Sequence, residues 1–323
     1  MRRTFFLIGT LLVFAFLTGC KSPVVYIAGF EGPLYGDAVL WKNGVTQYLT
    51  DKTFRSQANS VFVSGKDVYV AGGGYNEEEI WVAKLWKNGK VQNLTNGTDE
   101  TYATARSVFV VNKDVYVAGE VRRKDQISLS AVLWKNGNIK YLSDGKEHVA
   151  VNSIFVEGDD VYIAAQYDAF AALWKNDKLE LLADTGVSRA YSVYAKGNDV
   201  YVAGMNHREA AVLWTNGVAQ ILPDRTKHTA YATSVFVSEK DVYVVGNENR
   251  GLGVWTVALW KNGIAQTLSD ESKPMYVTSV FVYKNDVYMA GMINDTGAFS
   301  KNGVVQNLGN EPLRAIVNSI FVK

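Results

Sequence analysis

Cysteine, histidine and proline are the scarce residues of this sequence. Its 323 residues include one cysteine, three histidines and five prolines. A single cysteine excludes an internal disulfide framework. The histidines show none of the spacings typical of zinc ligands, so we predict no metal site and no cofactor. So few prolines, beside 28 glycines, exclude a collagen-like or low-complexity chain.

An excess of charge of one sign is also missing. Lysine and arginine total 33 and aspartate and glutamate total 32, which leaves a net charge of +1. Nucleic-acid-binding proteins usually carry a basic surplus or a basic stripe. We therefore predict no nucleic-acid partner. The one long apolar run, residues 5–17, has 13 residues and is too short to span a bilayer as a helix.

The first twenty residues have the architecture of a signal peptide. Arg2 and Arg3 precede the apolar run, which ends in Leu17-Thr18-Gly19-Cys20. This ending resembles the lipobox of bacterial lipoproteins. The resemblance implies cleavage before Cys20 and lipidation of that cysteine on its sulfur and its new amino group.

Three segments follow from this resemblance. We expect a signal peptide over residues 1–19, a lipid-anchored cysteine and short linker over 20–23, and one folded domain over 24–323. Two or three acyl chains on Cys20 suffice for stable attachment to a membrane. Inner-membrane retention in enteric bacteria typically uses Asp after the lipidated cysteine, and here Lys21 follows it. We therefore expect a protein of the cell envelope, anchored in the outer membrane.

Three short motifs recur in fixed order along the chain. The first is Val-Tyr-Val-Ala-Gly and its variants, with tyrosines at Tyr26, Tyr69, Tyr116, Tyr162, Tyr201, Tyr243 and Tyr288. The second is Leu-Trp-Lys-Asn-Gly, with tryptophans at Trp41, Trp86, Trp134, Trp174, Trp214 and Trp260, and with Ser300 in the seventh copy. The third is Ser-Val-Phe-Val, beginning at Ser60, Ser107, Ser153, Ser192, Ser234, Ser279 and Ser319. Such a regular repeat predicts a repeat architecture.

Each motif has the composition of a β-strand. The Ser-Val-Phe-Val and Val-Tyr-Val strands are joined by a tight turn such as Ser64–Asp67, and Asn88-Gly89 is a strong hairpin signal. A short fourth strand follows each Asn-Gly turn. Four strands in about 44 residues resemble the blades of kelch and WD40 propellers in unit length and strand count. We predict an all-β fold, a seven-bladed β-propeller with four antiparallel strands per blade.

The ends of the repeat array indicate how the ring closes. The expected domain begins with a second strand, Val24–Ala28, and ends with a first strand, Ser319–Val322. We predict that the C-terminal strand pairs with the N-terminal strand to complete blade one. Closure of this kind removes the free sheet edges through which chains associate. We therefore expect a monomer.

Residues repeated in every blade are expected to be structural, because every blade must pack against its neighbours in the same way. We predict that the repeat tryptophans form the core between blades. The Asp before each second strand, as in Asp67, is expected to be a turn residue that bonds its own backbone. Residues that break the repeat are better candidates for a binding site.

The connections between second and third strands vary in length and share one face of the disc with the blade-to-blade connections. Variable loops on a rigid scaffold commonly carry function. We expect a glycan or a protein partner to bind on this face. Aromatic side chains there are candidate contacts: Trp81, Trp255, Tyr35, Tyr75 and Tyr167. Simple packing at the strand edge is the competing interpretation for Trp81 and Trp255.

A polar residue precedes each Ser-Val-Phe-Val strand, at the expected mouth of the central channel. Convergent polar groups in a concave mouth are common in ligand sites. Polar strand starts at a wet rim are the competing interpretation. The seven candidates are Asn59, Arg106, Asn152, Tyr191, Thr233, Thr278 and Asn318.

No catalytic motif is present, whether a nucleophile elbow, a Walker loop or a dinucleotide fingerprint. We therefore expect a non-catalytic lipoprotein whose propeller binds a ligand. Two alternatives stay open. One is a carbohydrate-active hydrolase or lyase, whose carboxylates would come from Glu31, Asp37, Glu77, Asp168 and Glu209. The other is a structural or assembly scaffold in the outer membrane.

Overall fold

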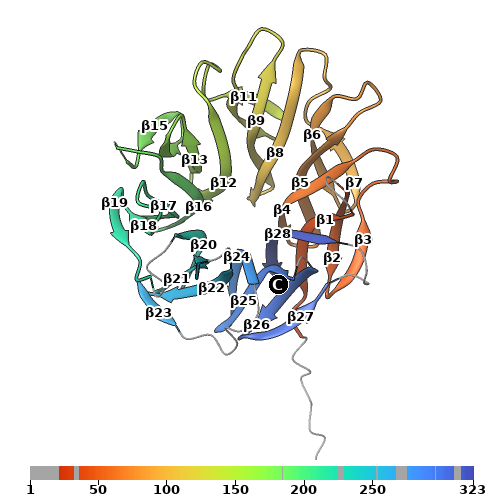
Figure 1. The fold of residues 1–323 in the computed structure, drawn as a ribbon. Coiled ribbons are helices and arrows are strands. Elements are labelled where there is room, and N and C mark those ends of the chain that lie inside the picture. The colour runs from red at the N-terminus through yellow and green to blue at the C-terminus, as the bar shows by residue number, and fades with distance from the viewer. Residues whose placement is uncertain are drawn as a thin grey trace, which may run out of the picture.

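The structure is a computed structural model that describes residues 22–32, 36–183, 185–224, 229–251, 254–266, 275–294, 296–308 and 314–323. Its 28 strands form seven four-stranded sheets, arranged as blades around a central axis (Figure 1). Neighbouring strands within a sheet run antiparallel. The fold is therefore a seven-bladed β-propeller, which confirms the prediction from the repeat.

The two strands of each blade nearest the axis come from the Ser-Val-Phe-Val and Val-Tyr-Val motifs. The innermost strands of blades one to seven are β28 (Ala315–Val322), β4 (Ser56–Ser64), β8 (Glu100–Val111), β12 (Val149–Glu157), β16 (Arg189–Lys196), β20 (Ala230–Ser238) and β24 (Met275–Tyr283). The second strands are β1 (Val25–Glu31), β5 (Asp67–Tyr75), β9 (Asp114–Arg123), β13 (Asp160–Tyr167), β17 (Asp199–Met205), β21 (Asp241–Asn249) and β25 (Asp286–Ile293).

The outer two strands of each blade flank the Lys-Asn-Gly turn. The third strands are β2 (Asp37–Lys42), β6 (Trp81–Lys87), β10 (Ser130–Lys135), β14 (Phe170–Lys175), β18 (Ala211–Thr215), β22 (Trp255–Lys261) and β26 (Thr296–Lys301). The outermost strands are β3 (Val45–Tyr48), β7 (Lys90–Asn93), β11 (Asn138–Tyr141), β15 (Lys178–Leu181), β19 (Val218–Ile221), β23 (Ile264–Gln266) and β27 (Val304–Asn307).

The ring closes through blade one, as predicted. Strand β28 pairs antiparallel with β1, from Val25 opposite Val322 to Glu31 opposite Ala315. The pairing extends to the residues beyond, since the backbone N–H of Val24 donates to the carbonyl of Lys323 at 2.7 Å and the reverse bond is 3.0 Å. The last described strand thus supplies the inner edge of the first blade, and β28 lies beside β1 in Figure 1.

The hydrophobic core is divided among the seven seams between blades. The cluster around Trp86, for example, joins Val61 of blade two to Ala28 and Leu40 of blade one. All six repeat tryptophans are at most 1% exposed, which confirms their assignment to the core. Gly72 explains the Ala-Gly motif, because a Cβ there would lie 3.0 Å from the Trp86 ring and 2.0 Å from a backbone oxygen.

The turns follow the predicted chemistry, with one correction. Asn88 and Gly89 have φ angles of 51° and 79°, as a two-residue type I′ hairpin requires. Asp67, expected to bond its own backbone, instead accepts a hydrogen bond from the Asn88 side chain at 2.8 Å and pairs with Lys87 at 3.0 Å. The first turn of the blade is thereby tied to the second. The Lys–Asn–Asp set is called the hairpin clasp below.

The innermost strands also bond to one another around the axis. In six of the seven seams the serine of Ser-Val-Phe-Val accepts a hydrogen bond from a backbone N–H of the next blade, at 3.2–3.3 Å. The aromatic residue of the motif forms a closed ring of seven side chains with centroid spacings of 4.3–5.1 Å: Phe62, Phe109, Phe155, Tyr194, Phe236, Phe281 and Phe321. This aromatic ring narrows the central channel.

Candidate functional site

The disc has two unlike faces, because strand direction sends all tight turns to one end of the blades. The turn face is made by the first-to-second turns 64–67, 111–114, 157–160, 196–199, 238–241 and 283–286, the third-to-fourth turns 42–45, 87–90, 135–138, 175–178, 215–218, 261–264 and 301–304, and residues 22–24 and 322–323. The loop face, opposite, carries the longer connections and the ends where the innermost strands begin.

Each innermost strand contains a β-bulge near the loop face. The register of pairing with the second strand slips by one residue between, for example, Ala58 and Ser60. The residue skipped in each blade is the polar residue singled out from the sequence: Asn59, Arg106, Asn152, Tyr191, Thr233, Thr278 and Asn318. A bulge leaves its residue out of the ladder and turns its side chain away from the regular alternation. The seven bulge residues therefore share one level of the channel mouth.

Several bulge residues bridge to the next blade. Asn59 and Asn318 each donate from Nδ2 to a backbone carbonyl one blade away, at 2.8 Å. Asn152 does the same toward Ala190, and Thr233 donates to the carbonyl of Val277 at 3.2 Å. A buried carbonyl left without a donor would be costly. Much of the polar ring therefore also links neighbouring blades.

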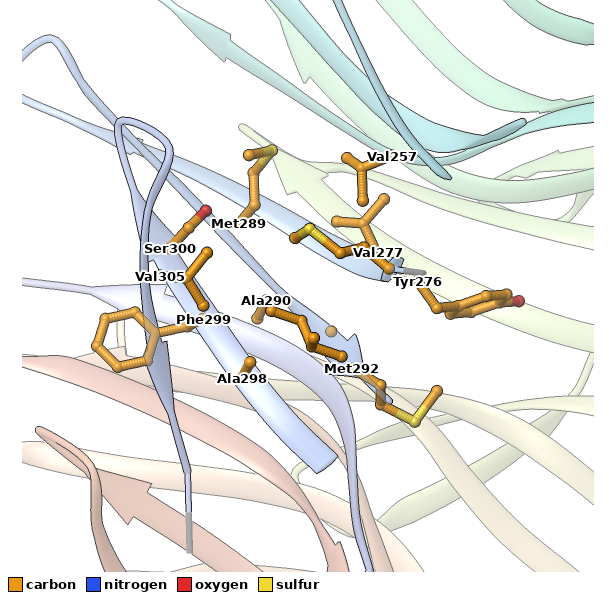
Figure 2. Close-up of a pocket in the computed structure, with 13 residues that line it drawn as sticks. Val257, Tyr276, Val277, Met289, Ala290, Met292, Ala298, Phe299, Ser300 and Val305 are labelled. Atoms are coloured by element: carbon orange, nitrogen blue, oxygen red, sulfur yellow. The ribbon is translucent and has the colours of Figure 1, made fainter. Parts of the chain in front are cut away.

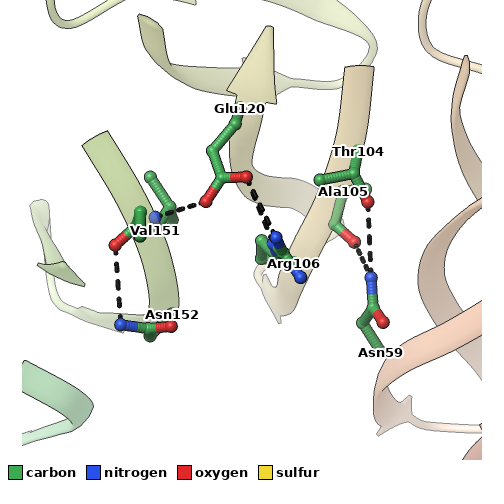
Figure 3. A network of polar contacts seen from close by, with 8 residues as sticks. Asn59, Thr104, Ala105, Arg106, Glu120, Val151 and Asn152 are labelled. Carbon is green, nitrogen blue, oxygen red and sulfur yellow. Dashed lines mark hydrogen bonds and ion pairs between the residues drawn. The ribbon is translucent and has the colours of Figure 1, made fainter. Parts of the chain in front are cut away.

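The bulge residue of blade three, Arg106, pairs with a buried carboxylate. Arg106 Nη2 lies 3.1 Å from Glu120 Oε2, and the Glu120 side chain is 1% exposed (Figure 3). The other Glu120 oxygen accepts a hydrogen bond from the backbone N–H of Val151 in blade four at 2.6 Å. The carboxylate is therefore compensated on both oxygens, and it joins blades three and four.

The main cavity of the loop face opens over blades four to seven and one, at the channel mouth. Its volume is about 630 Å³. Five of its lining residues are bulge residues, and the full lining is Asn152, Arg189, Tyr191, Met205, Glu209, Thr229, Tyr231, Thr233, Tyr276, Thr278 and Asn318. Asn59 and Arg106, on the far side of the ring, do not line it. We call it the channel-mouth cavity.

Three tyrosines gather on one side of this cavity. Tyr231 is central, with ring centroids 6.0 Å from Tyr191, 6.1 Å from Tyr276 and 5.2 Å from Trp255. Burial, and then a hydrogen bond with Tyr276, raise the pKa of Tyr231 well above its usual value. Burial also raises the pKa of Tyr191. The hydroxyls of these two tyrosines therefore stay protonated at neutral pH and can donate as well as accept.

Tyr231 and Tyr276 were missed by the sequence analysis, although a signal existed. Each stands two residues before a bulge residue, and side chains two apart in a strand share a face. The equivalent residues of the other blades are Gln57, Thr104, Ala150, Arg189 and Ile316. The aromatic residues at this position thus occur only in blades six and seven, beside the bulge Tyr191 of blade five. The repeat that builds every blade does not account for this asymmetry.

One cation and one carboxylate complete the cavity wall. Arg189 is exposed and donates from Nε to Gln166 at 2.9 Å. Glu209 accepts a hydrogen bond from the hydroxyl of Thr229. Of the five carboxylates considered for glycoside hydrolysis, Glu209 alone is among the described lining residues. Glu31, by contrast, is buried and accepts hydrogen bonds from Trp41 and Tyr48.

The loop aromatics predicted as contacts lie mostly outside the cavity. Trp81 is 7% exposed and packs edge-on against Tyr75, at a centroid distance of 5.0 Å. The absence of a side chain at Gly73 leaves room for its indole. Tyr167 packs against Trp174, and only Trp255 contacts the tyrosines of the cavity. Tyr35 lies outside the described residues.

A second cavity lies in the seam between blades six and seven, where the repeat tryptophan is replaced by Ser300. It measures about 20 Å³ and is lined mainly by apolar side chains, among them Met275, Met289 and Met292 (Figure 2). The other blades have Ser, Ala or Val at the position of Met275, and Ile or Val at that of Met289. The methionines have taken up most of the space of the missing indole. This cavity has room for about one water.

In the described part of the chain, no three side chains of His, Cys, Asp or Glu are placed to hold a metal ion. Nor does any described helix have the length and hydropathy needed to span a bilayer. Cys20 precedes the first described residue.

Comparison with known proteins found solved structures only. No family model and no curated protein matches the chain. A Mycobacterium tuberculosis puromycin-hydrolysing peptidase is 10% identical over 88% of this chain and 54% of its own, with a TM-score of 0.59. YCF48 bound to D1 peptide is 12% identical over 86% of this chain and 84% of its own, with a TM-score of 0.52. A Pyrococcus horikoshii acylaminoacyl peptidase is 13% identical over 90% of this chain and 51% of its own, with a TM-score of 0.54.

These similarities show the fold alone. The chain spans about half the length of the two peptidases. At 10–13% identity, no residue role is carried over from any of the three.

Proposed function

We propose that the protein is a non-catalytic, lipid-anchored binding protein of the bacterial envelope, and that it binds a peptide segment of a protein partner in the channel-mouth cavity. The lipobox-like Leu17–Cys20 segment supports the lipid anchor. Lys21, which follows the cysteine in place of the Asp typical of inner-membrane retention, supports the assignment to the outer membrane. The observation that carries the binding proposal is the gathering of Tyr191, Tyr231 and Tyr276 on adjacent blades of an otherwise repeated ring.

The chemistry of the wall favours a peptide over a glycan. Tyrosine and arginine are enriched where proteins bind proteins, and they supply much of the affinity there. Arg189 and Glu209 offer one charge of each sign, which suits a chain with both acidic and basic groups, and Met205 adds an adaptable apolar surface. YCF48, a propeller of similar extent, was solved with a peptide bound, so the architecture accommodates such a ligand.

A photo-crosslinking experiment tests the proposal. A benzophenone amino acid replaces Tyr276 in the full chain, which is expressed in its native cells. In the matched control the same amino acid replaces Gln57, which holds the same strand position in blade two. We expect a discrete cross-linked protein at 276 and none at 57. Equal cross-linking at the two positions, or none at 276, would contradict the proposed site.

The cross-linked partner then allows affinity to be measured. A soluble form that starts at residue 22 should bind the partner's peptide, and Tyr276→Ala should weaken binding by about 2 kcal/mol, or roughly 30-fold in Kd. Gln57→Ala should leave the Kd unchanged. A glycan array probed with the same two variants separates the classes, since a glycan signal lost only in Tyr276→Ala would replace the peptide by a sugar.

A further inference from the structure

The structure places the start of the described chain on the turn face. Val25 donates its backbone N–H to Asn43 Oδ1 in a Lys-Asn-Gly turn at 2.8 Å, and Val24 is bonded to Lys323. The side chain of Lys323 reaches the carbonyl of Gly65 in another turn of the same face. A tether that leaves the propeller at Val24 therefore leaves from the turn face.

The tether is too short to reach the other face. Cys20 lies four residues before Val24, and fully extended residues span at most about 3.5 Å each, so the reach is ~14 Å. Strand β28 alone has eight residues and crosses about 26 Å from face to face. A lipid on Cys20 could not pass around the disc to the loop face.

The turn face is also the basic face of the molecule. Its turns and ends carry 14 lysines and 10 acidic side chains, whereas the remainder of residues 20–323 carries 17 basic and 22 acidic side chains. Five of the lysines pair with aspartates of the hairpin clasps. Because each pair holds one charge of each sign, the surplus of positive charge on this face is unchanged. Anionic lipid headgroups attract such a surplus.

Exposed aliphatic side chains mark one arc of this face. The first residue of the outermost strand is aliphatic in blades five, six, seven and one, where Val218, Ile264, Val304 and Val45 are 73%, 67%, 71% and 66% exposed. The same position holds Lys90, Asn138 and Lys178 in blades two, three and four. In blades two and three the exposed aliphatic residue comes one place later, on the other surface of the strand. The arc runs from blade five to blade one, the blade from which the tether leaves.

A hollow of about 680 Å³ lies at this arc, between blades seven and one. It is lined by Pro23, Phe299, Lys301 and Val304, among others. An ammonium group beside apolar rings and an aliphatic side chain suits the boundary between headgroups and acyl chains. The hollow thus opens next to the tether, where a bilayer would lie.

We propose that the turn face of blades five, six, seven and one rests on the anionic bilayer that holds the lipidated Cys20. This inference rests on the proposed lipid anchor. Val218, Ile264, Val304 and Val45 enter the headgroup region, the lysines lie over anionic phosphates, and the channel-mouth cavity faces away from the membrane. The disc is tilted, because the outermost strands of blades two to four begin with Lys90, Asn138 and Lys178 and offer no aliphatic side chain at this position.

The test uses the full lipidated chain in vesicles of phosphatidylcholine and phosphatidylglycerol. An acylated Cys20 has no free thiol, so a cysteine introduced by Val304→Cys or Ile264→Cys is the single site for an NBD fluorophore. Lys90→Cys and Lys178→Cys are matched controls at the same strand position, and Glu77→Cys reports on the loop face. We expect the fluorophore at 304 and 264 to be bleached by aqueous dithionite several-fold more slowly than at 90, 178 or 77.

The outcomes separate this inference from the proposals on which it rests. Equal bleaching at 304 and 90 in a chain whose Cys20 carries the acyl mass would overturn the inference and leave the anchor intact. A Cys20 without acyl chains would overturn both. Binding of the peptide by the soluble form is independent of either result. In vesicles of phosphatidylcholine alone, the protection at 304 and 264 should fall, and unchanged protection would overturn the role of the lysines.

Discussion

Single residues that depart from the repeat are informative because the other blades serve as internal controls. Tyr231 and Tyr276 depart from it at the channel mouth, where the equivalent residues of the other blades are not aromatic. Ser300 departs from it in the core, where six other blades have a buried tryptophan. The first departure creates a surface for recognition. The second leaves a weak point in the seam between blades six and seven, whose core cluster has only five buried residues among those the structure describes.

Ser300 is the clearest target for stabilisation. Its hydroxyl is buried, and no described side chain or backbone group bonds it. Removing a buried polar group without a partner recovers its desolvation cost, so Ser300→Ala should raise the free energy of unfolding by about 1 kcal/mol. Ser300→Trp alone should lower it by roughly 1–3 kcal/mol, because Met289 and Met275 already occupy the space.

A double variant separates overpacking from a general intolerance of tryptophan. Val occupies the position of Met289 in several blades, so Ser300→Trp with Met289→Val restores the repeat pair and should recover most of the loss. Urea unfolding of the soluble form measures all of these variants. A destabilised Ser300→Ala protein would mean that the hydroxyl is bonded to ordered water.

At the scale of the element, the hairpin clasp shows what the sequence could and could not predict. The Asn88-Gly89 turn and the strands around it were predicted because a type I′ turn is a local property of two residues. The bond between Asp67 and Asn88 joins residues 21 apart and depends on the register of three strands, so the local interpretation of Asp67 failed. The β-bulges were missed for the same reason, although their residues were identified as polar.

The candidate site was predictable only in part. The bulge residues were found because their polarity interrupts an apolar motif. For Trp81 the sequence left both a contact role and packing at the strand edge open, because only the three-dimensional structure shows that Gly73 makes room for its indole. The cavity itself depends on how blades five to seven meet at the axis, which no local pattern encodes.

The hairpin clasps predict a loss of stability in acid. A hydrogen bond from Asn88, and then the pairing with Lys87, hold the pKa of Asp67 below its usual 3.8, and similar contacts lower the pKa of Asp114 and Asp160. A carboxyl with a lowered folded-state pKa contributes stability above its unfolded pKa, and loses it as the pH falls through the folded value. The melting temperature should therefore be nearly constant from neutral pH to about 5 and fall below about 4.

Replacing clasp aspartates isolates this effect. A triple variant with Asp67→Asn, Asp114→Asn and Asp160→Asn should melt at a lower temperature than wild type at neutral pH and lose less between pH 5 and pH 3. The matched control is Asp125→Asn, which alters an exposed aspartate outside the clasps. Differential scanning calorimetry at a series of pH values provides the measurement. Parallel curves for the triple variant and wild type would refute a role of the clasps in acid stability.

At the scale of the whole molecule, the propeller depends on one non-local pairing. Every other sheet is built from consecutive strands, whereas blade one needs β28 from the far end of the chain. That strand also supplies Phe321 to the aromatic ring and accepts, at Ser319, a hydrogen bond from blade two. Its loss would open the sheet edge of β1 and break the ring in three ways at once.

Deletion of residues 315–323 should therefore abolish the folded monomer. An unpaired β1 edge is a template for association, so we expect aggregates or high-order oligomers by size-exclusion chromatography and loss of the near-UV circular dichroism signal. A synthetic peptide of residues 314–323 added during refolding should restore the monomer.

A circular permutant is the control. It joins Lys323 to Val24 through a short linker and starts at the exposed Lys52 between blades one and two, which leaves every blade continuous. We expect it to fold, because Val24 and Lys323 are already hydrogen-bonded neighbours. A truncated chain that stayed monomeric with an unchanged melting temperature would show that closure of the ring does not hold this propeller together.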